Sequence, residues 1–581
     1  MAKEENHTLS RRALIKGAAA LAGGVLVAGA VPAAGHGPAA GGSRPKRPAI
    51  ESGDESAVAA TTAGLVRGYV SDGIYTFKGI PYGAPTGGEA RFQPPSKPQP
   101  WSGVRSAMVY GPTCPTPVRY RYMSDNENAF LFSPHYDALD EDCLRLNVWS
   151  PGLENDGRRP VMVWLHGGGC AAWSAQYLAC TEGENLSRDE DVVVVSINHR
   201  LGPFGFLHLA DFGGAPYAHS GNAGTLDMMA GLEWIRDNIA KFGGDPDNVT
   251  LFGVSGGGTK IGALMTMPSA KGLFHKAIVM SGTTRGTTSA EHAGTVASAI
   301  MTELGIKPGV DGVGQLKKIP AEQLLAAADV VLDRLVPPVK TPGGFYPKAR
   351  DYGWGPTVGG SLLPDFPFLV EAPGCSAHVP LMIGTVLHEV MPPFFNREAE
   401  KLSEAELHER LTSACGERTA SFIAAYRQAY PGVKPIELLA IMYSTYVRHT
   451  AVSWLERKTA QKAAPAYLYW FTWHTPVLDG RPRAFHCLDL PFAFKNTDRC
   501  ASMTGGGDDA RALAKRMSHA LSSFARTGDP NHAGLPPWPV FNAADAPVMM
   551  FDSKCEARNH PDRELILLFR DVLRSHPSVG S

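Results

Sequence analysis

Several short runs of the chain are almost continuously apolar: 160–165, 191–197, 249–252, 276–282, 380–384 and 466–473. Such runs are typical of parallel strands that helices cover on both faces, whereas a strand with one wet face alternates apolar and polar residues. Between two of these runs, residues 222–242 place apolar side chains at helical spacing. Alternation of strands and helices predicts an α/β fold with a mostly parallel central sheet and helices on both faces.

The pattern also indicates how this core is extended. The folded domain is expected over 58–575, and segments 62–68 and 74–82 are expected to pair as a hairpin at its start. Two longer stretches, about 284–353 and 396–462, have a mainly helical pattern. We expect them to be insertions that cover the active face of a single domain.

The N-terminal residues have the pattern of a targeting segment. Ser10–Lys16 contains a twin-arginine motif, and an apolar stretch rich in alanine and glycine follows to Ala34. This predicts a signal peptide over 1–34 and export by the twin-arginine route to the periplasm or the medium. The alternative is an uncleaved membrane anchor, but the stretch is barely long enough and diluted by glycine, so no stable span is expected after cleavage. Residues 35–57 are predicted to be a disordered linker.

Composition excludes some classes of function. The chain has 581 residues, of which 44% are hydrophobic and 19% charged, with a net charge of −1. Because there is no basic excess, nucleic acid is not an expected partner. None of the nine cysteines forms a C-x-x-C pair, which argues against a zinc site. No metal or organic cofactor is expected.

A glycine-rich turn follows the apolar run 249–252. It contains Gly253-x-Ser255-x-Gly257, and a helical pattern begins at Thr259. This arrangement resembles the nucleophile elbow of the α/β-hydrolases, in which glycines on either side of the serine remove side chains that would clash in a sharp strand-to-helix turn. The backbone N–H of Gly256 would then face a developing negative charge. An ordinary glycine-rich turn is the alternative, and the surrounding motifs decide between the two.

Those motifs resemble the type-B carboxylesterases, the family that includes bacterial para-nitrobenzyl esterases and the cholinesterases. The resemblance is carried by 91–95, 141–149, 524–531 and 537–539, and extends from about residue 60 to about 555. It implies the α/β-hydrolase fold, a serine esterase activity on a small-molecule ester, and no cofactor. Val254 stands where the cholinesterases have glutamate, and no tryptophan precedes Cys143 where they bind a quaternary ammonium, so a cholinesterase is not expected.

The resemblance also assigns a catalytic triad. In α/β-hydrolases the chain order is serine, carboxylate, histidine. His486, in the motif 484–494, matches the family's base, and Glu389, after the run 380–384, matches its acid. His388 occupies a place that the family usually fills with an acidic or polar residue. Three further acids remain as alternatives to Glu389: Asp351, Asp365 and Asp489.

Other site residues follow from the same resemblance. The H-G-G-G motif that begins at His166 predicts an oxyanion hole from the N–H groups of Gly168, Gly169 and Gly256, the last replacing the family's usual alanine. Ser281 matches a serine that supports the triad by hydrogen bonding, although it can equally cap a turn.

Cysteines, aromatic residues and one lysine complete the candidates. Cys114 and Cys143 match the family's first disulfide, with two reduced buried thiols as the alternative. Six residues are expected either to shape the substrate pocket or to be plain packing: Cys170, Trp173, Tyr346, Trp354, Phe394 and Phe395. Lys260, unusual for the family, is expected to face solvent or to pair with an acid.

Together these observations predict an exported serine carboxylesterase that works through an acyl-enzyme intermediate. The nearest alternative is an amidase or carbamate hydrolase with the same triad. An alternative of another class is a non-catalytic binding protein of the same fold, which filled triad positions disfavour. The oligomeric state has no signature in the sequence.

Overall fold

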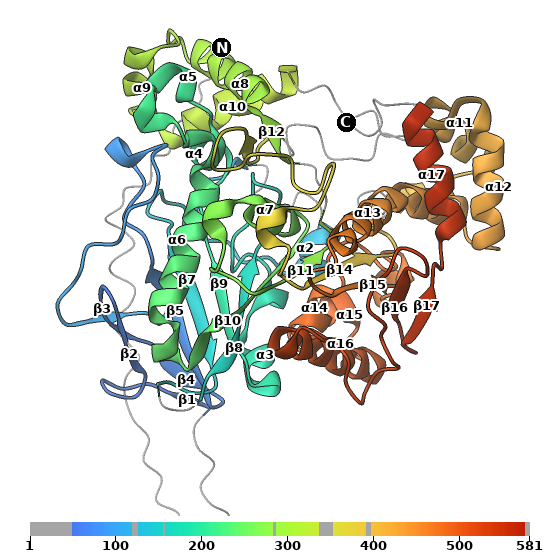
Figure 1. Ribbon diagram of the computed structural model, residues 1–581, viewed down its shortest axis with the longest axis horizontal. Helices are drawn as coiled ribbons and strands as arrows, with labels where there is room; N and C mark the ends of the chain where they lie inside the picture. Colours follow the sequence, from blue (N-terminus) through green and yellow to red (C-terminus); the bar gives the residue numbers. More distant parts are fainter. Residues whose placement is uncertain are drawn as a thin grey trace, which may run out of the picture. The chain divides into compact units, whose positions relative to one another are not determined.

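The computed structural model describes residues 49–118, 126–154, 157–282, 286–335, 353–390 and 397–575. Its main sheet is built from β1 (Ile50–Glu51), β4 (Tyr69–Ser71), β5 (Ile74–Pro81), β7 (Arg145–Ser150), β8 (Arg159–Leu165), β9 (Val193–Ile197), β10 (Gly244–Val254), β11 (Lys276–Met280), β14 (Leu381–Val386), β15 (Ala466–Phe471), β16 (Pro547–Phe551) and β17 (Glu556–Asn559). Their order is β1-β4-β5-β7-β9-β8-β10-β11-β14-β15-β16-β17 (Figure 1). Neighbours from β9 to β16 pair in parallel, and the outer strands pair antiparallel. The predicted mostly parallel sheet is confirmed.

The predicted hairpin between 62–68 and 74–82 is wrong. β3 (Gly64–Arg67) pairs with β2 (Val58–Thr61) and β6 (Val104–Ser106), whereas β5 pairs with β4 and β7. Asp72 and Gly73, between β4 and β5, both have positive φ (44° and 83°), as a tight two-residue hairpin turn requires. This Asp-Gly turn makes β4, and not β3, the hairpin partner of β5.

The predicted linker is partly a strand, because β1 pairs antiparallel with β4. The predicted signal peptide and residues 35–48 lie outside the described residues.

Each face of the sheet carries its own hydrophobic core. Along β8, Val161 and Val163 belong to one cluster, and Met162 and Trp164 to the other. Successive strand residues point to opposite faces, so a strand covered on both sides must be apolar throughout. The first cluster includes α6 (Ala223–Asn238), α7 (Gly256–Thr266) and part of α13 (Pro435–Ala460), and the second includes α3 (Glu184–Glu190), α14 (Leu490–Ala493) and α16 (Asp508–Thr527) (Figure 1).

Both stretches predicted as insertions are mainly helical where they are described. The first contains α8 (Ala290–Glu303), α9 (Val310–Leu316) and α10 (Ala321–Leu335), and the second contains α11 (Glu404–Cys415), α12 (Thr419–Ala429) and α13. α11, α12, the first half of α13 and α17 (Arg563–Ser575) form a third cluster. That these helices cover the active face stays a prediction.

The remaining strands and α-helices are short. They are the two-stranded sheet of β12 (Thr288–Ser289) and β13 (Thr357–Val358), and the helices α2 (Asn126–Phe132), α4 (Gly202–Phe206), α5 (Ala210–Gly213) and α15 (Ala501–Thr504). None of the helices described has both the length and the apolarity that crossing a membrane requires.

Candidate active site

Ser255 occupies a strained turn between β10 and α7. Its backbone angles, φ 56° and ψ −119°, are rarely adopted by residues other than glycine. Its N–H donates to the carbonyl of Met280 on the adjacent strand at 2.8 Å, which fixes the turn. The side chain is half-buried. The strain is therefore held by the surrounding sheet, as at a functional site.

The flanking glycines are required by close backbone contacts. A Cβ on Gly253 would lie 2.6 Å from the carbonyl oxygen of Leu165, and a Cβ on Gly257 would lie 2.1 Å from the same atom. The G-x-S-x-G spacing is therefore required because the carbonyl group of Leu165, at the end of β8, lies close to the backbone on both sides of Ser255.

The structure brings Glu389 and His486 together. Ser255, Glu389 and His486 follow the carboxyl ends of β10, β14 and β15, which share one edge of the parallel sheet. His486 Nδ1 donates to Glu389 Oε2 at 2.6 Å, and Glu389 Oε1 accepts the backbone N–H of Val386 at 3.0 Å. The Glu389 side chain is 2% exposed and that of His486 is 33% exposed. With its proton on Nδ1, the ring keeps Nε2 as a proton acceptor.

Glu389 favours the charged form of His486. Burial disfavours the imidazolium, but charges and hydrogen bonds from Cys487 and Glu389 outweigh it and raise the pKa of His486 well above its ordinary value. Because burial also raises the pKa of the Cys487 thiol, that thiol is neutral near pH 7, and Glu389 supplies the negative charge. A general base must start neutral, so activity that depends on His486 is expected to fall as pH drops through this pKa.

His388 ties the loop of Glu389 to the loop of His486. Its backbone N–H donates to the carbonyl of Ala484 at 3.1 Å, and its Nδ1 accepts the N–H of Ala484 at 3.3 Å. Because Nδ1 accepts, the ring proton sits on Nε2, which faces Glu437 Oε1 at 3.7 Å. Burial lowers the pKa of His388 to about 4, so this imidazole is neutral.

The same neighbourhood holds three side chains whose spacing would suit a metal ion. Potential ligand atoms of His388, Glu437 and His474 lie within 4.8 Å of one another. However, the protonated Nε2 of His388 has no free lone pair, and Glu437 Oε2 accepts a hydrogen bond from Arg483 at 2.7 Å. This geometry argues against a cation here.

The loop 167–169 lies directly against the elbow. A Cβ on Gly256 would lie 2.4 Å from Gly169 Cα, so the two backbones touch. The carbonyl of Gly168 accepts hydrogen bonds from Ala171 and Ala172, whereas no residue in the described part of the chain accepts one from the N–H of Gly168 or Gly169. The N–H of Gly256 is at the first position of α7, where helices leave amides unpaired. This arrangement is compatible with the predicted oxyanion hole.

Lys260 differs from both expectations. It does not face solvent, because every residue of α7 is buried, and its Nζ donates to the carbonyl of His166 at 2.8 Å, not to an acid. A basic residue in the otherwise neutral run 256–266 was the only signal of this arrangement in the sequence, and its backbone partner has none.

The remaining polar candidates are Ser281 and the three alternatives to Glu389 as the triad acid. The hydroxyl of Ser281 is buried and makes no hydrogen bond with the described residues, so its supporting role stays a prediction. Of the alternative acids, Asp365 is exposed and Asp351 lies outside the described residues. Asp489 is buried and accepts a hydrogen bond from the Tyr469 hydroxyl at 2.8 Å, and burial raises the pKa of Asp489 to about 7. Glu389 is the acid that contacts His486.

The cysteine and pocket predictions have mixed outcomes. Cys114 and Cys143 are buried free thiols, Cys114 and burial raise the pKa of the Cys143 thiol well above its ordinary value, and the predicted disulfide stays a prediction. Cys170 and Trp354 are buried in the first core cluster, which favours packing. Trp173 is half-buried and stacks on Tyr177 with ring centroids 5.6 Å apart. Three predicted pocket residues lie outside the described residues: Tyr346, Phe394 and Phe395.

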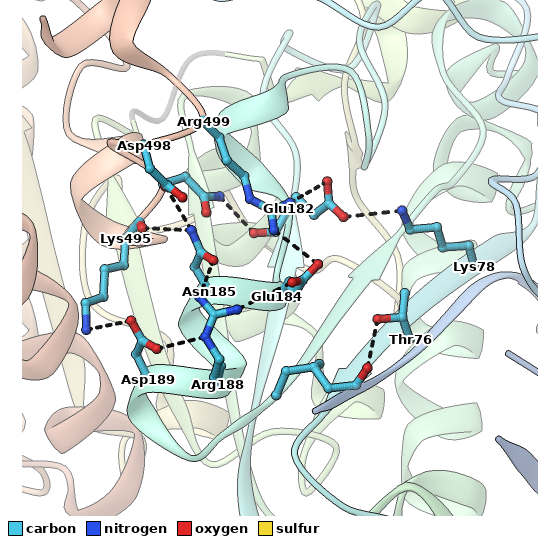
Figure 2. A network of polar contacts seen from close by, with 12 residues as sticks. Thr76, Lys78, Glu182, Glu184, Asn185, Arg188, Asp189, Lys495, Asp498 and Arg499 are labelled. Atoms are coloured by element: carbon cyan, nitrogen blue, oxygen red, sulfur yellow. Dashed lines mark hydrogen bonds and ion pairs between the residues drawn. The ribbon is translucent and has the colours of Figure 1, made fainter. Parts of the chain in front are cut away.

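A polar network anchors the segment that follows His486 (Figure 2). Arg499 pairs with Glu182 at 3.0 Å and with Glu184 at 3.1 Å, and Glu182 also pairs with Lys78 of β5 at 3.2 Å. These ion pairs connect the segment that follows His486 to α3 and to β5 in the N-terminal half of the sheet.

Comparison with known proteins agrees with this geometry. Residues 55–566 match the sequence model of the carboxylesterase family. The chain is 36% identical over 517 residues to the para-nitrobenzyl esterase of Bacillus subtilis (strain 168), covering 87% of this chain and 97% of that one. It is 34% identical over 502 residues to the phenmedipham hydrolase of Pseudarthrobacter oxydans, covering 85% and 94%.

Solved structures show the same relationship. An esterase from Clostridium hathewayi that can hydrolyse aliphatic aromatic polyesters has a TM-score of 0.75 and 36% identity, covering 90% of this chain and 99% of its own. The carboxylesterase EST55 of Geobacillus stearothermophilus at pH 6.2 has a TM-score of 0.73 and 34% identity, covering 89% and 99%. The chain therefore belongs to the carboxylesterase family, has the α/β-hydrolase fold, and is a serine hydrolase that acts on esters.

Proposed function

We propose that this protein is an exported carboxylesterase whose catalytic triad is Ser255, Glu389 and His486. The observation that carries the proposal is the 2.6 Å hydrogen bond between His486 Nδ1 and Glu389 Oε2, formed at the sheet edge where β10 delivers Ser255. Nucleophilic catalysis by serine needs a base and a group that orients it, and this pair supplies both.

The proposed reaction has two halves. Ser255 Oγ attacks the ester carbonyl carbon while His486 Nε2 takes its proton, and the N–H groups of Gly168, Gly169 and Gly256 stabilise the oxyanion. The tetrahedral intermediate collapses, and His486 protonates the departing alcohol. Water then attacks the acyl-enzyme with His486 again as base, which releases the carboxylic acid and restores Ser255. The pair with Glu389 stabilises the imidazolium in both halves.

Export rests on the twin-arginine motif and the apolar stretch of residues 1–34. An amidase or carbamate hydrolase would use the same triad, and the difference lies in how well the leaving group is protonated. A non-catalytic binding protein would have no need for an oriented base, so the retained Glu389–His486 hydrogen bond disfavours it.

The test is hydrolysis of p-nitrophenyl esters, graded from acetate to long acyl chains, by wild type and Ser255→Ala, with Ser269→Ala as the matched control. Ser269 is an exposed serine just beyond α7. We expect Ser255→Ala to lose at least about 10³-fold in kcat, since little beyond the oxyanion hole and substrate binding remains without the nucleophile. Ser269→Ala should match wild type. Turnover by Ser255→Ala equal to wild type would refute the triad, and amide or carbamate substrates cleaved faster than esters would favour the nearest alternative.

A further inference from the structure

Lys260 is a charged residue inside a fully buried helix. It lies five positions after Ser255 in α7, and its exposed fraction is 0%. Burying an ammonium costs several kcal/mol unless hydrogen bonds or an opposite charge compensate. A lysine at this position therefore needs an explanation that packing alone does not give.

The only hydrogen-bond partner of Lys260 Nζ in the described ranges is the carbonyl oxygen of His166, at 2.8 Å. His166 directly follows the last residue of β8 and begins the loop that carries Gly168 and Gly169. In this loop the His166 ring donates back to the carbonyl of Gly167 at 2.9 Å. Lys260 thus fixes the first peptide group of the loop that carries Gly168 and Gly169, here called the oxyanion loop.

The groups that face Lys260 are uncharged. The rings of His166 and His199 stack with centroids 4.9 Å apart, and burial, with the charge of Lys260, lowers the pKa of both well below the ordinary value. Burial raises the pKa of the Cys170 thiol to about 11. Because none of these neighbours carries a negative charge near pH 7, the ammonium has no counter-ion among these described groups.

We propose that Lys260 is a positioning residue for the oxyanion hole. Its ammonium holds the His166 carbonyl, and with it the loop that carries the amides of Gly168 and Gly169. It also places a positive charge next to this loop. The proposal rests on the proposed function and deepens it. A preorganised positive charge in a site with little water stabilises a transition state that gains negative charge more than it stabilises the neutral ester.

The charge of Lys260 should be visible in the pH profile. Burial lowers the pKa of Lys260 to about 8, so the amine is charged below this pH and neutral above it. Wild-type kcat/KM should therefore decrease as pH rises through about 8. This basic limb has the opposite sense to the acid limb set by His486, along which kcat/KM increases with pH.

The test compares Lys260→Met and Lys260→Gln with wild type and with Lys458→Met. Glutamine keeps an N–H donor for the His166 carbonyl but has no charge. Lys458 in α13 is a matched control, because it is also buried, donates to the carbonyls of Ser376 and Ala377 at 2.8 Å, and has a pKa that burial lowers to about 8. Active enzyme is counted by stoichiometric labelling of the serine with a fluorophosphonate.

We expect both Lys260 variants to lose about tenfold in kcat at pH 7 per labelled site, with little change in KM, and to lose the basic limb. Lys458→Met should keep wild-type kcat and the basic limb. A basic limb that persists in Lys260→Met, or a Lys260→Gln variant as active as wild type, would overturn the proposal.

Two further results distinguish a failure of the Lys260 proposal from a variant that does not fold and from a failure of the proposed triad. If neither Lys260 variant folds, the wild-type profile decides, since kcat/KM that stays level from pH 7 to pH 10 overturns the proposal. Failure of the proposed function would instead appear as full activity of Ser255→Ala.

Discussion

Replacing Gly256 by alanine is the sharpest test of the oxyanion geometry, because alanine is the residue that the family usually carries there. In this protein the new Cβ would lie 2.4 Å from Gly169 Cα and 2.5 Å from its N and O atoms. Carbon atoms pack at about 3.5–4.0 Å, so the elbow or the loop would have to move by about 1 Å. All the clashing atoms are backbone, so no side-chain rotation relieves the contact.

The expected size of the effect follows from that displacement. A shift of about 1 Å in a positioning group typically costs about 100-fold in rate, or about 2.7 kcal/mol of transition-state stabilisation. The loss should appear in kcat with KM nearly constant, because the oxyanion forms only in the transition state. Helix propensity affects stability and not the rate. Alanine at a helical position is about 1 kcal/mol more favourable than glycine, so it partly offsets the cost of the clash to the free energy of unfolding.

The assay is steady-state hydrolysis of p-nitrophenyl butyrate at pH 7.5, with thermal unfolding in parallel. Gly314→Ala in α9 is the control, because a Cβ there meets no atom within 4 Å. It should gain the helix propensity and leave kcat unchanged. A Gly256→Ala enzyme within threefold of wild type would refute the reasoning, since the loop would then tolerate the family's residue without loss.

Two predictions concern titrating groups. Glu389→Gln keeps the shape of the triad acid but removes its charge, so kcat should fall by about 10²–10⁴-fold. The acid limb of kcat/KM should also move to lower pH, because a carboxylate no longer raises the pKa of His486. An acid limb that stays at the wild-type pH would contradict this prediction. Burial raises the pKa of Asp489 to about 7, against about 4 in an unfolded chain, so the free energy of unfolding should fall as pH rises from about 4 to about 7. Asp489→Asn, which keeps an acceptor for Tyr469, should raise the Tm at pH 8 but not at pH 4, and equal shifts at both pH values would contradict the assignment.

The central sheet was predictable because a strand buried on both faces is a continuous apolar run, which is visible in the sequence itself. Each predicted parallel run corresponds to a strand between β8 and β15. The N-terminal pairing was not predictable in the same way, because only one of the four residues of β3 is buried, so this strand has no continuous apolar run. The Asp72-Gly73 turn was the available local signal for the β4–β5 hairpin.

The site shows the same division. Motifs indicated Ser255, Glu389 and His486, whereas their arrangement depends on contacts between residues far apart, such as the 97 positions between Glu389 and His486. Lys260 and His388 depart from the family pattern in the sequence, but both contact backbone groups. A carbonyl such as that of His166 leaves no trace in side-chain chemistry, so these interactions require coordinates.

The long helix α13 has a consequence for how the molecule unfolds. Its first half supplies Ile436, Leu439 and Met442 to the third cluster, and its second half supplies Val452 and Trp454 to the core beneath the sheet. Because one uninterrupted helix of 26 residues is shared, the α11–α12–α17 lobe cannot melt as an independent foldon without exposing part of the sheet core. Amide protons along α13 should therefore exchange with solvent as one cooperative unit, at the rate of global opening.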